Sequence, residues 1–335
     1  MSARRRRVGQ PVVGLNPPDR RVRQIVTNLV GAVLLGVFVV GCSTSSTPEG
    51  APALRVAAGP EPESQLLART IVLLLDEAGI PASPLGFADG RSARQAVELG
   101  DAELLVAYSG EEWLTRLGRP NPPADPREAL EALLVADRDR GLTWLVPSFG
   151  SGIEDPPANA TFAFFAAGPP SVHADLRSLS ELSLRLAERP ELSLCVDTEF
   201  GRREDGLAAL LSAYSVRRDR PFLAADPGDA VRRVLDGDCV AGLSDATDGR
   251  AWSGGMVPLA DDLRFFPALV PAPVVRSETL SAMPEIRAAL QPLLDGLSTG
   301  RLGRANGAVV RGANLDSVAG ELARSLLRED VESSG

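Results

Sequence analysis

The sequence has no lysine, one histidine, three cysteines and two tyrosines among its 335 residues. Without lysine there is no P-loop, and neither a G-x-S-x-G nor an H-E-x-x-H motif occurs, so the usual signatures of phosphate-loop enzymes, serine hydrolases and zinc peptidases are missing. His173 stands beside Asp175 in a polar stretch without a cysteine partner, and we interpret it as a surface residue. We therefore expect no enzyme activity, no metal and no cofactor.

Charge is distributed unevenly along the chain. Residues 1–41 contain seven arginines and one aspartate, whereas the remainder has 28 arginines and 43 acidic residues, a net charge of −15. Such a negative body disfavours nucleic acid as a partner. The full chain is 44% hydrophobic and 24% charged, which is typical of a globular protein. The 294 residues after position 41 (335 minus 41) suffice for one large or two medium domains.

The N-terminal region predicts export. An apolar run from Ile25 to Val40 follows the arginines and leads into Gly41 and Cys42. A basic head, a short apolar segment and small residues at a cleavage point are the parts of a signal peptide. The alternative is a transmembrane anchor, for which the run is rather short, because spanning the hydrocarbon needs about 20 apolar residues.

The four residues Val-Val-Gly-Cys at 39–42 resemble a bacterial lipobox. The resemblance implies cleavage before Cys42, lipid on Cys42, and a body held at the extracytoplasmic face of the cell membrane. Residues 42–53 are rich in serine, threonine, proline and glycine, so they predict a flexible tether. Cys195 and Cys239 remain as an even pair. In an oxidising compartment they either form a disulfide or stay as two buried thiols.

Strand and helix patterns alternate from Leu54 onward. The first series predicts strands at 54–57, 82–86 and 102–107 and helices at 63–78, 92–99 and 127–138. The second series predicts strands at 161–166, 192–197, 222–225 and 239–244 and helices at 179–187, 206–214 and 227–235. An extended stretch at 265–275 and helices at 283–297 and 315–327 close the chain. This rhythm indicates an α/β protein with doubly wound, mostly parallel sheets in two lobes.

Several short motifs occur at fixed spacing. T-D-G-R at 247–250, L-A-D-D at 259–262, F-F-P at 265–267 and P-A-P-V-V-R at 271–276 resemble the second half of the glycine betaine/choline/osmoprotectant substrate-binding lipoproteins of ABC importers. Upstream, Y-S-G at 108–110, W-L-x-P at 144–147, N-x-T-F-A at 159–163 and E-F at 199–200 resemble landmarks of the same family. The resemblance covers nearly the whole chain from Leu54 to about Leu327.

That resemblance implies a periplasmic-binding-protein-like fold. Residues 54–160 would form the first part of lobe 1, residues 161–262 lobe 2, and residues 263–330 the return to lobe 1. The cleft would close on a small quaternary-ammonium or other cationic or zwitterionic solute and present it to ABC permease and ATPase subunits. The alternative is a degenerate binding-protein fold that acts as a surface sensor or partner-binding lipoprotein without transport.

The resemblance also implies an aromatic cage. A quaternary ammonium donates no hydrogen bond, so the faces of aromatic rings hold it. Tyr108 and Tyr214 fall where the family has tyrosines, and Phe162 replaces a third. Leu105 stands where a further tyrosine is frequent, which thins the cage. Each ring also has an alternative interpretation without a ligand: Tyr108 and Phe162 would pack in the core, and Tyr214 would pack at the surface.

Three polar residues complete the predicted site. Asp245 lies at the carboxyl end of a predicted strand, where open α/β sheets bind ligands, and its negative charge favours a cation. The alternative is that Asp245 is a solvated acidic residue of a loop without a ligand. Ser109 and Thr161 either donate hydrogen bonds to a ligand oxygen or cap the following turn.

Overall fold

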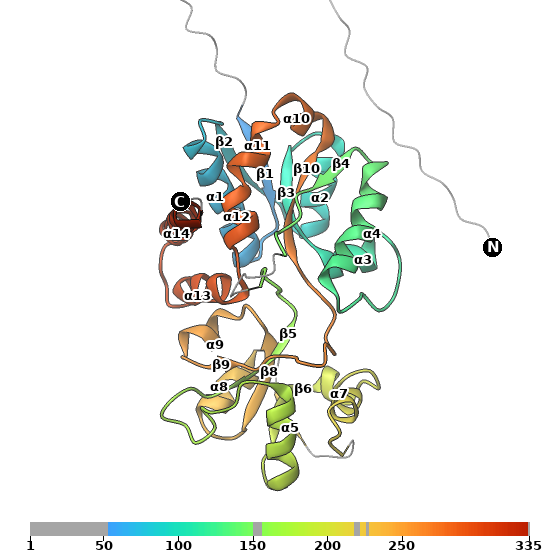
Figure 1. The fold of residues 1–335 in the computed structure, drawn as a ribbon, viewed down its shortest axis with the longest axis vertical. Coiled ribbons are helices and arrows are strands. Elements are labelled where there is room, and N and C mark those ends of the chain that lie inside the picture. Colours follow the sequence, from blue (N-terminus) through green and yellow to red (C-terminus); the bar gives the residue numbers. More distant parts are fainter. Residues whose placement is uncertain (1–52, 150–155, 218–221, 226–227, 334–335) are drawn as a thin grey trace, which may run out of the picture. The chain divides into compact units, whose positions relative to one another are not determined.

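The computed structural model describes residues 53–149, 156–217, 222–225 and 228–333. The predicted signal peptide, the lipid site Cys42 and the tether up to residue 52 lie outside the described residues. The described chain folds around two five-stranded sheets (Figure 1). Within this part of the chain, no helix combines the length and the apolar character that crossing a membrane requires.

The first sheet has the strand order β2-β1-β3-β10-β4. Its strands are β1 (Leu54–Ala58), β2 (Ala82–Gly86), β3 (Leu104–Tyr108), β4 (Leu142–Trp144) and β10 (Pro271–Arg276). β1 runs parallel to β2 and β3, whereas β10 runs antiparallel to β3 and β4. The first sheet therefore combines the beginning of the described chain with a strand that returns after the whole second sheet.

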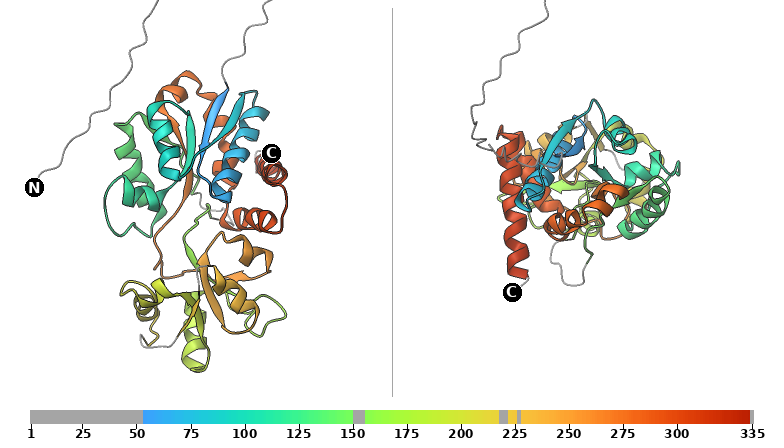
Figure 2. Two further views of the ribbon diagram at one scale, coloured as in Figure 1. Left: turned by 180° about the vertical axis from the view of Figure 1, so that it is seen from behind. Right: turned by 90° about the horizontal axis from the view of Figure 1, so that it is seen from above.

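Helices cover both faces of the first sheet (Figures 1 and 2). They are α1 (Pro62–Glu77), α2 (Gly90–Leu99), α3 (Ser109–Thr115), α4 (Pro126–Arg138), α10 (Ser277–Ala282), α11 (Glu285–Ala289), α12 (Gln291–Gly296), α13 (Thr299–Val310) and α14 (Leu315–Ser333). Successive strand residues point to opposite faces. Val56 and Leu104 accordingly pack with α1, α12 and α14, while Ala57 and Leu105 pack with α2 and α4.

The second sheet has the strand order β7-β6-β8-β5-β9. It contains β5 (Phe162–Ala166), β6 (Leu194–Asp197), β7 (Phe222–Ala225), β8 (Ala241–Asp245) and β9 (Val257–Pro258), with helices α5 (Leu179–Glu188), α6 (Thr198–Arg202), α7 (Leu207–Ala213), α8 (Asp229–Leu235) and α9 (Gly249–Ser253). Phe164 packs with α5 and α7 on one face, and Phe165 packs with α8 on the other. The alternation seen in the sequence thus builds a core on each side.

The structure differs from the sequence-based expectation in several details. Each sheet is mixed rather than mostly parallel, because β10 and β5, which follow the crossings between sheets, run antiparallel to their neighbours. The helix expected at 283–297 is divided into α11 and α12, and Pro292 in the first turn of α12 has no N–H for a continuous ladder. The sequence did not predict α13, whose three glycines lower helix propensity.

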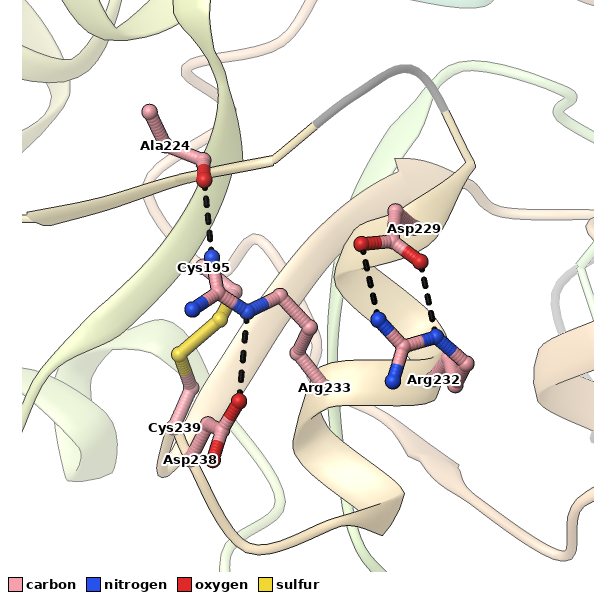
Figure 3. The surroundings of a disulfide bond; sticks show 7 residues. All are labelled: Cys195, Ala224, Asp229, Arg232, Arg233, Asp238 and Cys239. Atoms are coloured by element: carbon pink, nitrogen blue, oxygen red, sulfur yellow. Dashed lines mark hydrogen bonds and ion pairs between the residues drawn. A yellow bond between two sulfur atoms is a disulfide. The ribbon is translucent and has the colours of Figure 1, made fainter.

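Cys195 in β6 and Cys239 form a disulfide with their Cα atoms 5.7 Å apart (Figure 3). Cys239 lies just before β8 rather than inside the strand expected at 239–244. Both cysteines are buried against α8, whose Arg233 pairs with Asp238 at the surface (Figure 3). The bond therefore fastens the start of β8 to the neighbouring strand β6.

Candidate functional site

A cavity of about 900 Å³ is lined by residues of both sheets. The first sheet contributes Tyr108 at the end of β3, and α1, which packs on this sheet, contributes Glu63. The second sheet contributes Asp245 at the end of β8. The two segments that cross between the sheets contribute Ala160 and Leu269 to the lining. The cavity thus lies at the carboxyl ends of strands, where open α/β sheets bind ligands.

Tyr108 lines the cavity, and its hydroxyl group is bound to a neighbouring side chain. The hydroxyl donates a hydrogen bond of 2.6 Å to Oε1 of Glu63. Burial and the neighbouring Glu63 carboxylate raise the pKa of Tyr108 well above its usual value, so the phenol stays neutral. The hydroxyl proton of Tyr108 is therefore committed to Glu63.

Asp245 is an exposed carboxylate within the cavity. Desolvation by the surrounding protein raises its pKa to about 6, and repulsion from Asp248 and Glu63 adds to the shift. Arg250 opposes the shift, but its guanidinium group is engaged in an ion pair of 2.7 Å with Asp248. A bound cation would favour the ionised form of Asp245 by supplying the positive charge that this carboxylate lacks.

The cavity wall carries an excess of negative charge. Its charged residues are Arg91, Arg94, Arg116, Glu61, Glu63, Glu98, Glu111, Glu112 and Asp245. Arg94 and Arg116 each contact both Glu98 and Glu112, so these four charges compensate one another. The charged residues of the described lining that remain are the carboxylates of Glu61, Glu63, Glu111 and Asp245 and one arginine, Arg91. The lining is suited to a cation.

The paired charges belong to a buried network that stabilises the wall. Arg94 on α2 is 2% exposed, and its Nη2 lies 2.6 Å from Oδ2 of Asp137 on α4. Trp144 on β4 donates its indole N–H to the same oxygen at 2.7 Å. Glu112 on α3 is also buried, and burial raises its pKa despite the two arginines. Sequence reasoning missed this network, although Arg94 interrupts an apolar helix face beside Ala93 and Val97.

The two predicted hydroxyl donors stabilise the backbone instead of facing the cavity. Ser109 donates to the carbonyl oxygen of Ala268 at 3.2 Å and accepts from the Val270 N–H at 3.0 Å. Thr161 donates to the carbonyl oxygen of Pro267 at 2.6 Å. Both bonds reach the crossing segment that precedes β10. In this structure neither hydroxyl proton is available to a ligand oxygen.

The structure separates the predicted aromatic residues. Phe162 is 40% exposed and lies directly opposite Asp245 in the β5–β8 pairing, although it does not line the cavity. Its ring is 6.1 Å from those of Phe200 and Phe266. Tyr214 is buried in the second core, where its hydroxyl donates to Oδ1 of Asp261 at 2.5 Å. Among the described residues that line the cavity, only Tyr108 is aromatic.

Asn306 on α13 is a site neighbour that sequence reasoning missed. Its amide nitrogen donates to Oε2 of Glu63 at 2.6 Å and to the carbonyl oxygen of Thr247 at 2.9 Å. No local signal points to it, because Asn306 lies 243 residues from Glu63 in sequence. For metals, the described ranges hold no group of three or more ligating His, Cys, Asp or Glu side chains.

Comparisons with known proteins agree with this architecture. Residues 52–324 match the family model described as the substrate binding domain of ABC-type glycine betaine transport system. The chain is 25% identical over 269 residues to a glycine-betaine-binding protein of Pseudomonas aeruginosa, covering 78% of this chain and 82% of that protein. It is 25% identical over 296 residues to the glycine betaine-binding protein YehZ of Escherichia coli, covering 85% and 94%.

Solved structures share the fold. The apo structure of YehZ from Escherichia coli superposes with a TM-score of 0.73 at 24% identity, covering 82% of this chain and 99% of that chain. A glycine betaine/carnitine/choline ABC transporter structure gives a TM-score of 0.68 at 22% identity, covering 81% and 98%. These likenesses confirm the predicted periplasmic-binding-protein-like fold.

Proposed function

Because this chain belongs to the family of substrate-binding domains of ABC-type glycine betaine transport systems, we propose that it captures a small quaternary-ammonium cation in the cavity between its two sheets and delivers it to an ABC importer. It is a substrate-binding protein and not an enzyme. Two relatives carry the name of glycine betaine-binding proteins, which places a quaternary ammonium among the first ligands to test. The permease and ATPase subunits of the importer are its proposed partners.

The charge of the cavity wall carries this proposal. Outside the Glu98 and Glu112 network, the charged residues of the described wall are four carboxylates and one arginine, and Tyr108 lines the same cavity. A cation over an aromatic face gains ~0.5–2 kcal/mol, and more when the site is desolvated. Burial and repulsion from Glu61 raise the pKa of Glu111, so this carboxylate also gains from a nearby positive charge.

Among quaternary ammonium compounds, the cavity favours a choline-like cation over a betaine. A betaine carries a carboxylate that needs hydrogen-bond donors. The hydroxyl protons of Tyr108, Ser109 and Thr161 are all committed to protein acceptors, and Arg91 is the one arginine of the described lining that lies outside the Glu98 and Glu112 network. That carboxylate would also be repelled by Asp245. Choline, whose other end is a hydroxyl group, can donate a hydrogen bond to a carboxylate of the cavity wall such as Asp245.

Calorimetry with the chain purified in detergent tests this function. The ligands are choline, glycine betaine, and 3,3-dimethylbutan-1-ol, the uncharged carbon analogue of choline. We expect choline to bind most tightly, and Asp245→Asn to weaken it by about tenfold (~1.4 kcal/mol). Asp316→Asn, which alters an exposed acid on α14, is the matched control. Tighter binding of betaine, or equal binding of the uncharged analogue, would contradict the proposal.

We further propose that lipid on Cys42 holds the protein at the extracytoplasmic face of the cell membrane. The support is the sequence V-V-G-C at 39–42 and the polar tether that follows it. Cys42→Ser should leave an uncleaved precursor. Mass spectrometry of the native protein that found an intact Met1 terminus without lipid would disprove this part.

Lobe movement is part of the proposed binding cycle. Residues 54–160 and 263–330 would move as lobe 1 and residues 161–262 as lobe 2, about hinge segments near 157–162 and 262–267. These segments contact each other: the Thr161 hydroxyl donates to the Pro267 carbonyl oxygen at 2.6 Å. Solution scattering with and without saturating choline tests the closure, and identical dimensions would refute it.

The thinned aromatic lining supports a second candidate function, a surface sensor or partner-binding lipoprotein without transport. Tyr214 is committed to Asp261, and Phe162 does not line the cavity. Uptake of labelled choline in cells with and without this chain separates the two functions. Import requires that uptake fall when the chain is deleted, whereas a sensor would bind choline without changing uptake.

A further inference from the structure

Helix α13 contacts both lobes. Leu302 is fully buried in the core of the first sheet, whereas the glycines of the helix lie against α9 of the second sheet (Figures 1 and 2). A Cβ atom on Gly303 would come within 2.1 Å of the Trp252 indole nitrogen. A Cβ atom on Gly249 would come within 2.5 Å of the Asn306 carbonyl group. Only glycine allows α13 and α9 to approach this closely.

Trp252 fixes this contact. Its indole N–H donates to the carbonyl oxygen of Ala246 at 2.9 Å, which ties the ring to the loop after β8. The guanidinium group of Arg304 on α13 lies 5.6 Å from the ring centroid, within the range of a cation–π interaction. The α13–α9 contact is therefore a close packing contact with specific polar ties, and it lies outside the two crossing segments.

Asn306 connects this contact to the cavity. It donates to the Thr247 carbonyl oxygen, two residues beyond Asp245, and to Glu63, which accepts from Tyr108. Three hydrogen bonds of 2.6, 2.6 and 2.9 Å thus link Tyr108 of the first sheet to the loop that follows Asp245 in the second sheet.

We propose that Asn306 is a positioning residue that couples the two lobes: through Glu63 it sets where the Tyr108 ring stands relative to Asp245, and α13 acts as a third link between the lobes. When the second lobe moves, the Thr247 carbonyl oxygen of that lobe shifts the Asn306 amide that binds it, and the Glu63 carboxylate transmits the displacement to Tyr108. The ligand part of this inference rests on the proposed function, whereas the coupling itself does not.

A double-mutant cycle on the full chain in detergent tests the ligand part. We expect Asn306→Ala to weaken choline binding by about tenfold, the size expected for a hydrogen bond to a charged group. Because Asn306 acts through Glu63, the double variant with Glu63→Gln should lose no more than the larger of the two single losses. Losses that multiply would show independent action and overturn the proposal.

Hydrogen exchange on the ligand-free chain tests the coupling separately. Asn306→Ala should raise exchange both around Tyr108 and in residues 246–253, which lie on different sheets. Gly303→Ala, which forces α13 away from Trp252, should do the same. Asn314→Ala is the matched control, because its side chain caps α14 through the N–H groups of Asp316 and Ser317. Changes confined to α13, or equal to those of the control, would refute the coupling even if choline does not bind.

Discussion

Phe162 and Asp245 are direct partners in the antiparallel pairing of β5 with β8, so their side chains project from the same face of the second sheet. An exposed ring and a carboxylate of raised pKa therefore stand side by side, and in the proposed lobe closure the ring would approach a cation bound at Asp245. We expect Phe162→Leu to weaken choline binding by ~0.5–2 kcal/mol, the value of one ring contact. Calorimetry decides this. Unchanged affinity would assign Phe162 to the packing cluster with Phe200 and Phe266.

Choline affinity should depend on pH through Asp245. Its pKa is about 6 in the free protein, and the cation binds the ionised form. Below pH 6 Asp245 is increasingly protonated, so affinity should fall by about tenfold in total, the same loss as for Asp245→Asn, and it should level off above pH 7. Asp245→Asn should flatten this profile. Calorimetry from pH 4.5 to 8 measures it, and an equally steep profile in the variant would assign the titration to another group.

Tyr214→Phe should lower stability without changing ligand affinity. The substitution removes the donor to Asp261 and the acceptor of the Leu263 N–H, while Asp261 keeps its bond from the Phe266 N–H. Loss of such hydrogen bonds costs ~1–2 kcal/mol of unfolding free energy. Urea unfolding and choline calorimetry on the same preparation separate the two effects. A loss of affinity at unchanged stability would place Tyr214 in the binding site.

Arg94→Met should be strongly destabilising. It leaves Asp137, which is fully buried, and Glu112 without their main cation, at a cost of ~3–5 kcal/mol. Arg69→Met is the control, because Arg69 pairs with Asp316, which is 78% exposed, and such surface pairs contribute less than about 1 kcal/mol. Denaturant unfolding compares them. Equal losses would mean that the Arg94 network contributes no more than a surface pair.

Replacing both Cys195 and Cys239 with alanine should destabilise the second lobe by ~2–4 kcal/mol, because the disulfide closes a loop of 44 residues. Reductant should lower the melting temperature of the native chain and leave that of the double variant unchanged. A thiol assay after denaturation without reductant provides the direct check. Two reactive thiols at Cys195 and Cys239 would exclude the bond.

Local pattern made most of the fold predictable. β1 with Val56 and Ala57 on opposite faces, α1 with its apolar side, and α4 after the proline-rich loop follow from apolar periodicity and helix start signals. Short motifs such as T-D-G-R identified the family without any knowledge of contacts. α13 was missed because its glycines depress helix propensity, and in the folded protein they serve the close approach to α9.

The sequence by itself determined the residue types available to the site: two tyrosines, Phe162 and Asp245, with few other aromatics. Which of them face the cavity depends on tertiary structure, because a side chain turns inward or outward according to partners far away in the chain. Tyr108 meets Glu63 across 45 residues, and Tyr214 meets Asp261 across 47. The Arg94 network and the Asn306 link likewise depend on contacts between helices, which no local periodicity encodes.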